Sequence, residues 1–242
     1  MAVELKEDDS PVTIADLRSN TILVNGLKQL DDSIPIVSEE NKEIPWEVRQ
    51  SFEYFWIIDP LDGTTNFVHG LPHFSVSIAC IYKGQIEHAV VIDPIRREEF
   101  TASRGRGAAL NGRRIRVSSR KSFEGALIGT GIPFSGYAYE HITPYLNCVQ
   151  EIAGQTAGIR RCGSAALDLA YVAAGRFDAF WEMNLNKWDI GAGILLVKEA
   201  GGLVSDFNGG GDFFETGHIV CGSPKVFKPI LQIVQKNLGH LK

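Results

Sequence analysis

The sequence of 242 residues lacks the patterns that mark secreted, membrane-spanning and nucleic-acid-binding chains. It begins with neither the apolar core of a signal peptide nor a basic leader, and no apolar run approaches the length of a membrane span. Basic residues number 24 against 29 acidic ones, and the resulting net charge of −5 argues against non-specific attraction to nucleic acid or anionic membrane. These absences predict a cytoplasmic protein that requires neither nucleic acid nor membrane.

Cysteine is sparse, and no two cysteines form a CxxC pair. The four are widely spaced and mostly lie in apolar surroundings, where a free cysteine behaves as a small buried hydrophobe, so we expect a reducing compartment. They are Cys80, Cys148, Cys162 and Cys221. The histidines show no metal-ligand spacing such as HExxH and are assigned no chemistry: His69, His73, His88, His141, His218 and His240.

The chain also lacks repeats, low-complexity tracts and long linkers. Helical periodicity predicts helices over residues 13–30, 137–153, 164–174, 187–200 and 224–238. Alternating or apolar runs predict strands over 34–37, 54–58, 74–82, 86–93, 99–102, 126–130, 177–182, 203–205 and 219–222, with an antiparallel meander over 74–102. Such alternation favours α/β layering. A length of this order fits one large domain or two small ones, and the expected seam lies near residues 118–125.

The most informative stretch runs from Trp56 to Asn66 and reads Trp-Ile-Ile-Asp-Pro-Leu-Asp-Gly-Thr-Thr-Asn. It ends an apolar strand with two carboxylates, a turn and a possible helix start. Mg2+ takes carboxylate and carbonyl oxygens, and the first N–H groups of a helix favour an anionic group, so metal plus phosphate is one interpretation. An ordinary turn rich in Asp, Pro and Gly is an equally good one from these residues alone.

Taken over its whole length, this stretch resembles the metal-binding signature of the inositol monophosphatase family. Two later segments are similar to the same family: residues 163–176, and Trp188-Asp189 with the small residues that follow. From Trp56 onward the chain resembles the bacterial SuhB-type members, whereas residues 6–55 are more similar to CysQ-type 3′(2′),5′-bisphosphate nucleotidases. Family members also begin with an additional N-terminal helix that is absent from this sequence.

The resemblance implies a fold of α/β (α+β) class, the layered αβαβα sandwich shared by inositol monophosphatases and fructose bisphosphatases. Periodicity alone leaves α/β and α+β open. It further implies one phosphatase unit over 1–242, divided into a metal-binding subdomain (1–120) and a substrate-side subdomain (121–242). The implied cofactor is Mg2+, two or three ions per site with Mn2+ as a substitute, together with inhibition by Li+ and assembly as a homodimer.

The family motifs place the metal ligands on specific residues of this sequence. The implied ligands are Glu39, Asp59, Asp62, Asp189 and the carbonyl oxygen of Leu61. Without the resemblance, Glu39 and its neighbour Glu40 fit a solvated loop, and Asp189 fits a helix N-cap. Carboxylates gathered from distant segments are what metal-assisted hydrolysis of a phosphate ester needs.

The resemblance also implies the catalytic group, which consists of Thr64, Asp16 and the ligand Glu39. The Thr64 hydroxyl would orient the attacking water, and Asp16 would pair with Thr64 and help to deprotonate that water. The backbone N–H groups of Gly63 and Thr64 would bind the phosphate. A plain capping threonine and an exposed helical aspartate are the alternative interpretations.

The substrate is expected to contact a set of residues drawn from both halves of the chain. They are Asp62, Gly63, Thr64, Gly163, Ser164, Ala165, Glu182 and Asp189. Glu182 accepts hydrogen bonds from hydroxyls and repels a second phosphate, which favours myo-inositol monophosphate. The alternatives are adenosine 3′,5′-bisphosphate as substrate, and a catalytically impaired member of the family that acts as a binding protein.

Overall fold

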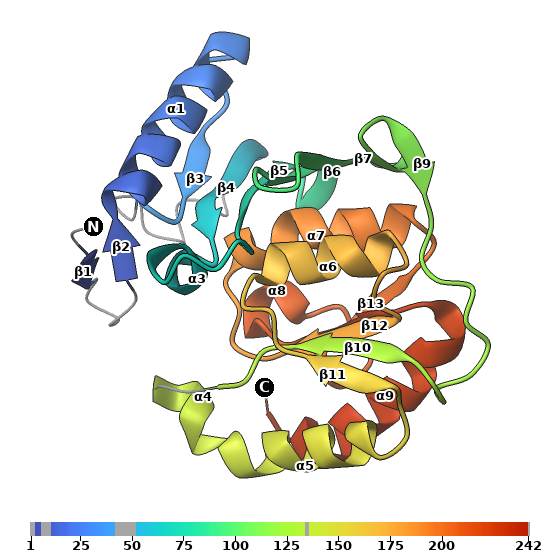
Figure 1. The fold of residues 1–242 in the computed structure, drawn as a ribbon. Coiled ribbons are helices and arrows are strands. Elements are labelled where there is room, and N and C mark those ends of the chain that lie inside the picture. The colour runs from blue at the N-terminus through green and yellow to red at the C-terminus, as the bar shows by residue number, and fades with distance from the viewer. Residues whose placement is uncertain (1–2, 6–10, 42–51, 134–135, 242) are drawn as a thin grey trace.

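Five layers of helix and sheet follow one another through the molecule (Figure 1). The computed structural model describes residues 3–5, 11–41, 52–133 and 136–241. The layers are α1 (Ile14–Leu30), a seven-stranded sheet, α6 (Ala165–Ala173) with α7 (Lys187–Glu199), a five-stranded sheet, and α5 (Ile142–Ala153) with α9 (Pro224–Leu238). The αβαβα sandwich expected from the resemblance is confirmed.

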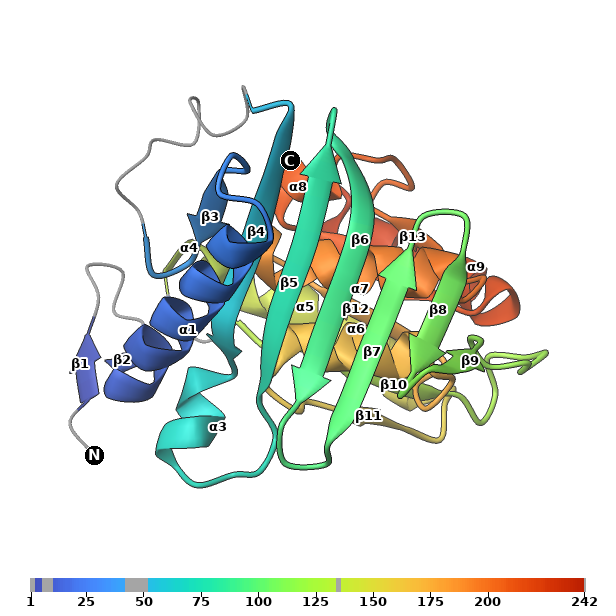
Figure 2. The same ribbon diagram turned by 90° about the horizontal axis from the view of Figure 1, so that it is seen from above.

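The larger sheet is an almost entirely antiparallel meander, seen from above in Figure 2. In spatial order its strands are β3 (Ile36–Ser38), β4 (Tyr54–Asp62), β5 (Ser75–Tyr82), β6 (Gln85–Asp93), β7 (Glu98–Ser103), β8 (Gly107–Leu110) and β9 (Arg113–Ile115). Only β3 and β4 run parallel. The turn between β5 and β6 has positive φ at both Lys83 and Gly84, as a tight hairpin requires.

The smaller sheet contains strands from the second half of the chain. In spatial order they are β11 (Gly158–Arg160), β10 (Leu127–Thr130), β12 (Ala179–Glu182), β14 (Ile219–Gly222) and β13 (Leu203–Ser205). The short strand β11 was not predicted, because three residues are too few to show a period. Three short helices and a small hairpin complete the described elements: α3 (Thr64–Val68), α4 (Gly136–Glu140), α8 (Phe213–Thr216), and β1 (Val3–Leu5) paired with β2 (Pro11–Thr13).

One apolar core lies on each face of the five-stranded sheet. Successive residues of a strand point to opposite faces and so belong to different cores. On β12, Phe180 belongs to the core shared with α6, α7 and the larger sheet, whereas Ala179 and Trp181 belong to the core beneath α5 and α9. All nine residues of α6 are buried, as expected for a helix that is apolar on all sides. Strands β3 to β9 form the larger sheet, and strands β10 to β14 form the smaller one. The division into a metal-binding and a substrate-side subdomain stays a proposal.

Helix α1 forms where it was predicted, but its apolar residues are not buried as an amphipathic pattern would require. Ile22 and Leu30 are 72% and 76% exposed, and Leu27 is the one buried leucine of the helix. The helix instead meets the larger sheet through polar contacts: Ser19 Oγ donates to the Pro60 carbonyl at 2.8 Å, and Ser38 Oγ donates to Asn20 Oδ1 at 2.7 Å. Polar contacts therefore orient α1 toward β4.

The helix predicted over residues 137–153 is divided into α4 and α5. Pro144 explains the break, because its nitrogen carries no hydrogen for the carbonyl of Glu140 and its ring would clash with that carbonyl. In the first turn of α5 the same proline is tolerated, since the N–H groups there have no partner within the helix. No helix within the described residues is long and apolar enough to cross a membrane.

Candidate metal and phosphate site

A bulge at the end of β4 brings the two aspartates of the signature to the same edge of the larger sheet. Asp59 pairs with Ser77 and Asp62 with Ser75, and the register shifts between these pairs. Pro60 cannot donate to the ladder, which favours such an irregularity. In a regular strand, residues three apart would project to opposite faces. The irregularity permits both carboxylates to serve one site.

The second half of the chain holds Asp62 in place. Its Oδ2 accepts hydrogen bonds from Ser164 Oγ at 2.6 Å, from the Ala166 backbone N–H at 2.8 Å and from Ser75 Oγ at 3.4 Å. Ser164 is 1% exposed, and it directly precedes α6. Asp62 is thus fixed between the larger sheet and the start of α6, over a separation of about a hundred residues in sequence.

Glu39 and Asp189 complete a group of four carboxylates. Glu39 follows β3, and its backbone N–H donates to the Ile58 carbonyl at 3.1 Å, beside Asp59. Asp189 lies in the first turn of α7, where its Oδ2 accepts from the Asn186 N–H at 2.7 Å. The N-cap position considered for Asp189 belongs to Asn186 instead, and Asp189 is the N3 residue that completes the capping box. This role engages one of the two carboxylate oxygens and is compatible with metal ligation by the other.

The electrostatics of the four carboxylates show that they face one another. Burial, followed by the charges of Glu39, Asp62 and Asp189, raises the pKa of Asp59 well above its ordinary value. Burial and the charges of Asp62 and Glu39 likewise raise the pKa of Asp189.

Burial also raises the pKa of Asp62, to about 6, although the hydrogen bonds from Ser164 and Ala166 oppose the rise. Buried like charges of this kind are stabilised by a bound cation, so the donor set fits a hard divalent ion. The charge of Glu39 acts on both Asp59 and Asp189, and the choice of Glu39 over Glu40 as a ligand stays a prediction.

The Thr64 hydroxyl lies between Asp16 and Leu61. Its Oγ1 is 3.0 Å from Asp16 Oδ1 and 3.0 Å from the Leu61 carbonyl oxygen. Asp16 is 1% exposed, in contrast to the exposed helical aspartate considered as the alternative, and its Oδ2 accepts from the backbone N–H and hydroxyl of Thr13. The structure brings Asp16 and Thr64 together, and their catalytic roles stay a prediction.

Asn66 ties the signature to the loop before α6. Its Nδ2 donates to the carbonyls of His73 at 2.7 Å and Cys162 at 2.8 Å, with that of Gly163 at 3.4 Å. Gly63, with φ of +94°, lies in the same packing: a Cβ there would stand 3.0 Å from the Gly163 carbonyl oxygen. Glycine is needed at this position for both its backbone conformation and the close approach.

Glu182 ends β12 on the substrate side of the site and is partly exposed. Its carboxylate lies directly against Gly131, where a Cβ would stand 1.8 Å from Glu182 Oε1. Burial and the charge of Asp62 raise the pKa of Glu182 to about 8, with Arg161 opposing the rise. The predicted substrate residues lie where α6 begins: Gly163 and Ser164 precede the helix, and Ala165 is its first residue. This helix start contacts Asp62 through the hydrogen bonds from Ser164 and Ala166.

Sequence reasoning missed three contributions to this site. Ser164 was expected to contact the substrate, and sequence reasoning did not show that its hydroxyl positions Asp62. Ser75 and Asn66 received no role, although Asn66 belongs to the signature. A single sequence carries no signal for contacts of this kind, because a buried hydroxyl or amide can bond to a carboxylate or a loop some 90 residues away.

The raised acid pKa values predict that the metal-free protein is more stable at lower pH. A carboxyl with a raised folded-state pKa binds more protons when folded than when unfolded, so stability is lost as pH rises toward the folded pKa. For Glu182, whose pKa is about 8, acidification from about pH 8 to about pH 6 should add about 2 kcal/mol, or roughly 4–8 °C in Tm. Thermal unfolding in EDTA, followed by circular dichroism, measures this.

The matched controls are Glu182→Gln and added Mg2+. The substitution removes the titrating group and should flatten the dependence of Tm on pH. Saturating Mg2+ favours the charged carboxylates and should raise Tm most at the alkaline end. A metal-free Tm that stays constant or falls on acidification over this range would contradict the electrostatic description.

Comparison with known proteins places this geometry in context. The model of the Inositol monophosphatase family matches residues 1–238. The Nus factor SuhB of Pseudomonas aeruginosa is 57% identical over 238 residues, covering 98% of this chain and 88% of that protein. The inositol-1-monophosphatase of Rhizobium meliloti is 45% identical over 236 residues, covering 98% and 87%. These matches extend over the residues before Trp56 as well as those after it. The separate likeness of residues 6–55 to nucleotidases stays a prediction, and part of this segment lies outside the described residues.

Solved structures agree with the fold. The extragenic suppressor protein SuhB from Bartonella henselae superposes with a TM-score of 0.91 at 43% identity, covering 98% of this chain and 89% of that one. An IMPase/NADP phosphatase complexed with Mg2+ and phosphate superposes with a TM-score of 0.82 at 24% identity, covering 96% and 85%.

Proposed function

This chain belongs to the inositol monophosphatase family, a family of phosphatases, and we propose that it hydrolyses myo-inositol monophosphate with the help of divalent metal ions. The observation that carries the proposal is the convergence of Glu39, Asp59, Asp62 and Asp189, which come from three distant segments, since the charge of Glu39 helps to raise the pKa values of the three aspartates. Such a group, with Asp59 and Asp62 buried and Glu39 and Asp189 half-buried, destabilises a fold unless a cation is bound. Such a loss of folding stability is expected where the acids serve a function.

Four carboxylates and one carbonyl would hold the ions in this proposal. They are Glu39, Asp59, Asp62, Asp189 and the Leu61 carbonyl. Bound Mg2+ polarises the phosphoryl oxygens and makes water a better nucleophile. The chain fixes the ligands in advance: Asp62 by Ser164 and Ala166, and Asp59 through the Leu61 N–H at 2.9 Å. Dependence on a divalent ion agrees with the Mg2+ complex of the IMPase/NADP phosphatase.

Thr64 is placed to orient the attacking water. When its hydroxyl donates to Asp16 Oδ1, at 3.0 Å, the lone pairs of Oγ1 remain to accept a hydrogen from water. A lone pair of that water then points away from Thr64 toward the substrate. As the water attacks, it would give its proton to the Thr64 hydroxyl, which would pass its own proton to Asp16. The backbone N–H groups of Gly63 and Thr64 would bind the phosphate oxygens.

The substrate-side residues favour a polyol with a single phosphate. Glu182 presents a carboxylate to hydroxyl groups, and the small residues Gly163, Ser164 and Ala165 leave room beside it. A second phosphate would be repelled by the same carboxylate. The family further suggests two or three Mg2+ ions with Mn2+ as a substitute, a homodimer and a cytoplasmic location. A lithium-soaked inhibitory complex of a staphylococcal relative supports sensitivity to Li+.

The substrate assignment predicts a measurable preference. With Mg2+, kcat/KM for inositol 1-phosphate should exceed that for adenosine 3′,5′-bisphosphate by about 10–100-fold, or roughly 1.4–2.8 kcal/mol. EDTA should abolish both activities. Above about pH 8, where Glu182 is ionised, Glu182→Gln should raise KM for the inositol ester and reduce the preference, because it removes the charge that repels a second phosphate. Phosphate release in steady-state assays gives these constants.

Glu151→Gln is the matched control, since Glu151 pairs with Lys236 on the far helices α5 and α9 and should leave both constants unchanged. A preference for the bisphosphate would instead support the nucleotidase alternative. Phosphate release that persists in EDTA would contradict the metal-dependent mechanism.

A second candidate is a binding role without turnover, and the name of the Pseudomonas relative, a Nus factor, favours it. The two candidates differ in one measurement. A folded chain that shows cooperative unfolding and Mg2+-dependent stabilisation, but no turnover on either substrate, would favour the binding role.

A further inference from the structure

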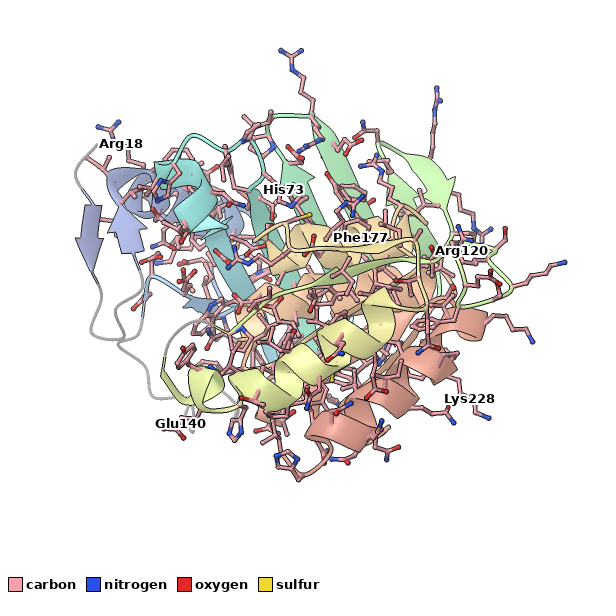
Figure 3. All side chains as sticks on the ribbon, turned by 60° about the horizontal axis from the view of Figure 1, so that its bottom comes forward. Arg18, His73, Arg120, Glu140, Phe177 and Lys228 are labelled. Carbon is pink, nitrogen blue, oxygen red and sulfur yellow. The ribbon has the colours of Figure 1, made fainter. Side chains whose placement is uncertain are left out.

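A second group of potential metal ligands lies near the carboxylate centre, since the charge of Asp62 acts on Asp168 in this group. His73, ahead of β5, Cys162, in the loop before α6, and Asp168, within α6, each offer one ligand atom, and these atoms all lie within 4.8 Å of one another. His73 Nε2 is 3.9 Å from Asp168 Oδ1. His73 is labelled in Figure 3, and its ring meets that of Tyr171 on α6 edge to face, with the centroids 5.8 Å apart.

Two atoms of this group are buried and have no hydrogen-bond partner among the residues that the structure describes. They are His73 Nε2 and Asp168 Oδ1. Asp168 is 1% exposed, and the other residues of α6 are apolar apart from the Tyr171 hydroxyl. The Cys162 side chain hydrogen-bonds to the Asp168 carboxyl, which leaves Oδ1 unpaired. Leaving a buried polar atom unpaired costs about 1–3 kcal/mol, so this oxygen indicates a ligand that the described residues do not supply.

We propose that His73, Cys162 and Asp168 form a site for a soft divalent cation of the Zn2+ class. An imidazole nitrogen, a thiolate sulfur and a carboxylate oxygen are the three donor types that zinc prefers, and a water or small ligand takes the fourth position. Mg2+ discriminates against sulfur and nitrogen, so this site and the carboxylate centre select different ions. Tetrahedral zinc holds its ligand atoms about 3.3–3.7 Å apart, and side-chain movements of about 1 Å reach this from the observed separations.

The backbone already positions two of the three ligands. The side-chain amide of Asn66 donates to the carbonyls of both His73 and Cys162, which fixes these two segments relative to each other. The third ligand is carried by a buried helix, with the Asp168 N–H bonded to the Ser164 carbonyl at 3.0 Å. A site on rigid elements loses little entropy when the ion binds.

The charge states of the ligands also suit a cation. Burial lowers the pKa of His73, which keeps the ring neutral and a nitrogen lone pair available. Burial, with the charges of Glu182 and Asp62, raises the pKa of Asp168 well above its ordinary value, and burial beside Asp168 raises the pKa of Cys162 to about 11. A bound cation reverses both shifts by displacing the protons. The nearby guanidinium of Arg96 is already paired with Asp93 at 2.8 Å.

Co2+ provides the test, because a thiolate ligand gives it a charge-transfer absorption in the near ultraviolet that oxygen ligands do not. Reduced, metal-free full-length protein is titrated with Co2+ in excess Mg2+, which occupies oxygen sites. We expect the band to saturate at one equivalent and Zn2+ to displace the Co2+. Cys162→Ser should abolish the band, and His73→Gln should weaken Zn2+ binding at least about tenfold, measured by competition with a chromophoric chelator.

Cys148→Ser is the control, since Cys148 lies in the other core and should leave the band intact. Circular dichroism and thermal unfolding establish that each variant is folded. The proposal is overturned if the folded parent protein shows no thiolate band, or if the band or tight Zn2+ binding survives Cys162→Ser. Both results are independent of phosphatase activity.

Discussion

Asp62→Asn should reduce Mg2+-dependent phosphate release from inositol 1-phosphate by about a thousandfold or more while the chain remains folded. The substitution keeps the size of the side chain and an oxygen that can accept from Ser164 and Ala166. It removes a carboxylate whose charge raises the pKa values of Asp59 and Asp189, so the proposed metal site loses a charge. Steady-state phosphate release and Mg2+ titration measure the two effects.

The stability of the same variant separates a metal ligand from a structural residue. Removing a buried charge from a group of like charges should leave the metal-free Tm unchanged or raised, whereas stabilisation by Mg2+ should shrink. Asp212→Asn, at an exposed aspartate, is the control and should behave like the parent protein. Full activity in Asp62→Asn would remove the basis of the proposed function, and a large loss of metal-free stability would assign Asp62 a structural role.

Asn66→Ala should destabilise the protein by about 2–4 kcal/mol, or roughly 5–15 °C in Tm, and lower activity about a hundredfold. The amide is 95% buried and supplies the hydrogen bonds that join the carbonyls of His73, Cys162 and Gly163. Alanine leaves these acceptors without their donor and frees the loop that carries Ser164, which positions Asp62. Denaturant unfolding and kcat/KM report the two losses.

Asn237→Ala is the appropriate comparison for Asn66→Ala. The Asn237 amide donates to Glu151 and to the Ile233 carbonyl on the outer helices, and it lies far along the chain from the loop before α6. Its loss should cost about 1 kcal/mol and leave activity unchanged. If Asn66→Ala matched this mild effect, the amide would not hold the site together.

The sequence predicted this fold well where local chemistry decides the structure. Helix α9 forms over the predicted residues because Pro224 begins it and apolar residues recur along one face, from Val226 to Leu238. The carboxylates of β4 were found because their spacing belongs to a long motif. Helix α1 formed as predicted but buried different residues, since polar contacts to Pro60 and Ser38 decide which side meets the sheet.

Long-range contacts account for what could not be predicted. Cys162 was expected to be a small buried hydrophobe and His73 to have no chemical role, and only the fold shows that both approach Asp168. The one available signal was an acidic residue within an otherwise apolar helix, since burying a lone carboxylate is costly. The hydroxyl of Ser164 is similar, because its contact with Asp62 joins the larger sheet to the start of α6 over 102 residues of sequence.

The order of the layers has a consequence for synthesis on the ribosome. The seven-stranded sheet is translated first, but its inner face packs against α6 and α7, which follow some fifty or more residues later. Until those helices emerge, Ala79, Val91 and Phe100 have no cover and the acidic centre lacks Asp189. The nascent first half therefore exposes apolar surface during synthesis, and the group of four carboxylates is complete only after α7 has been translated.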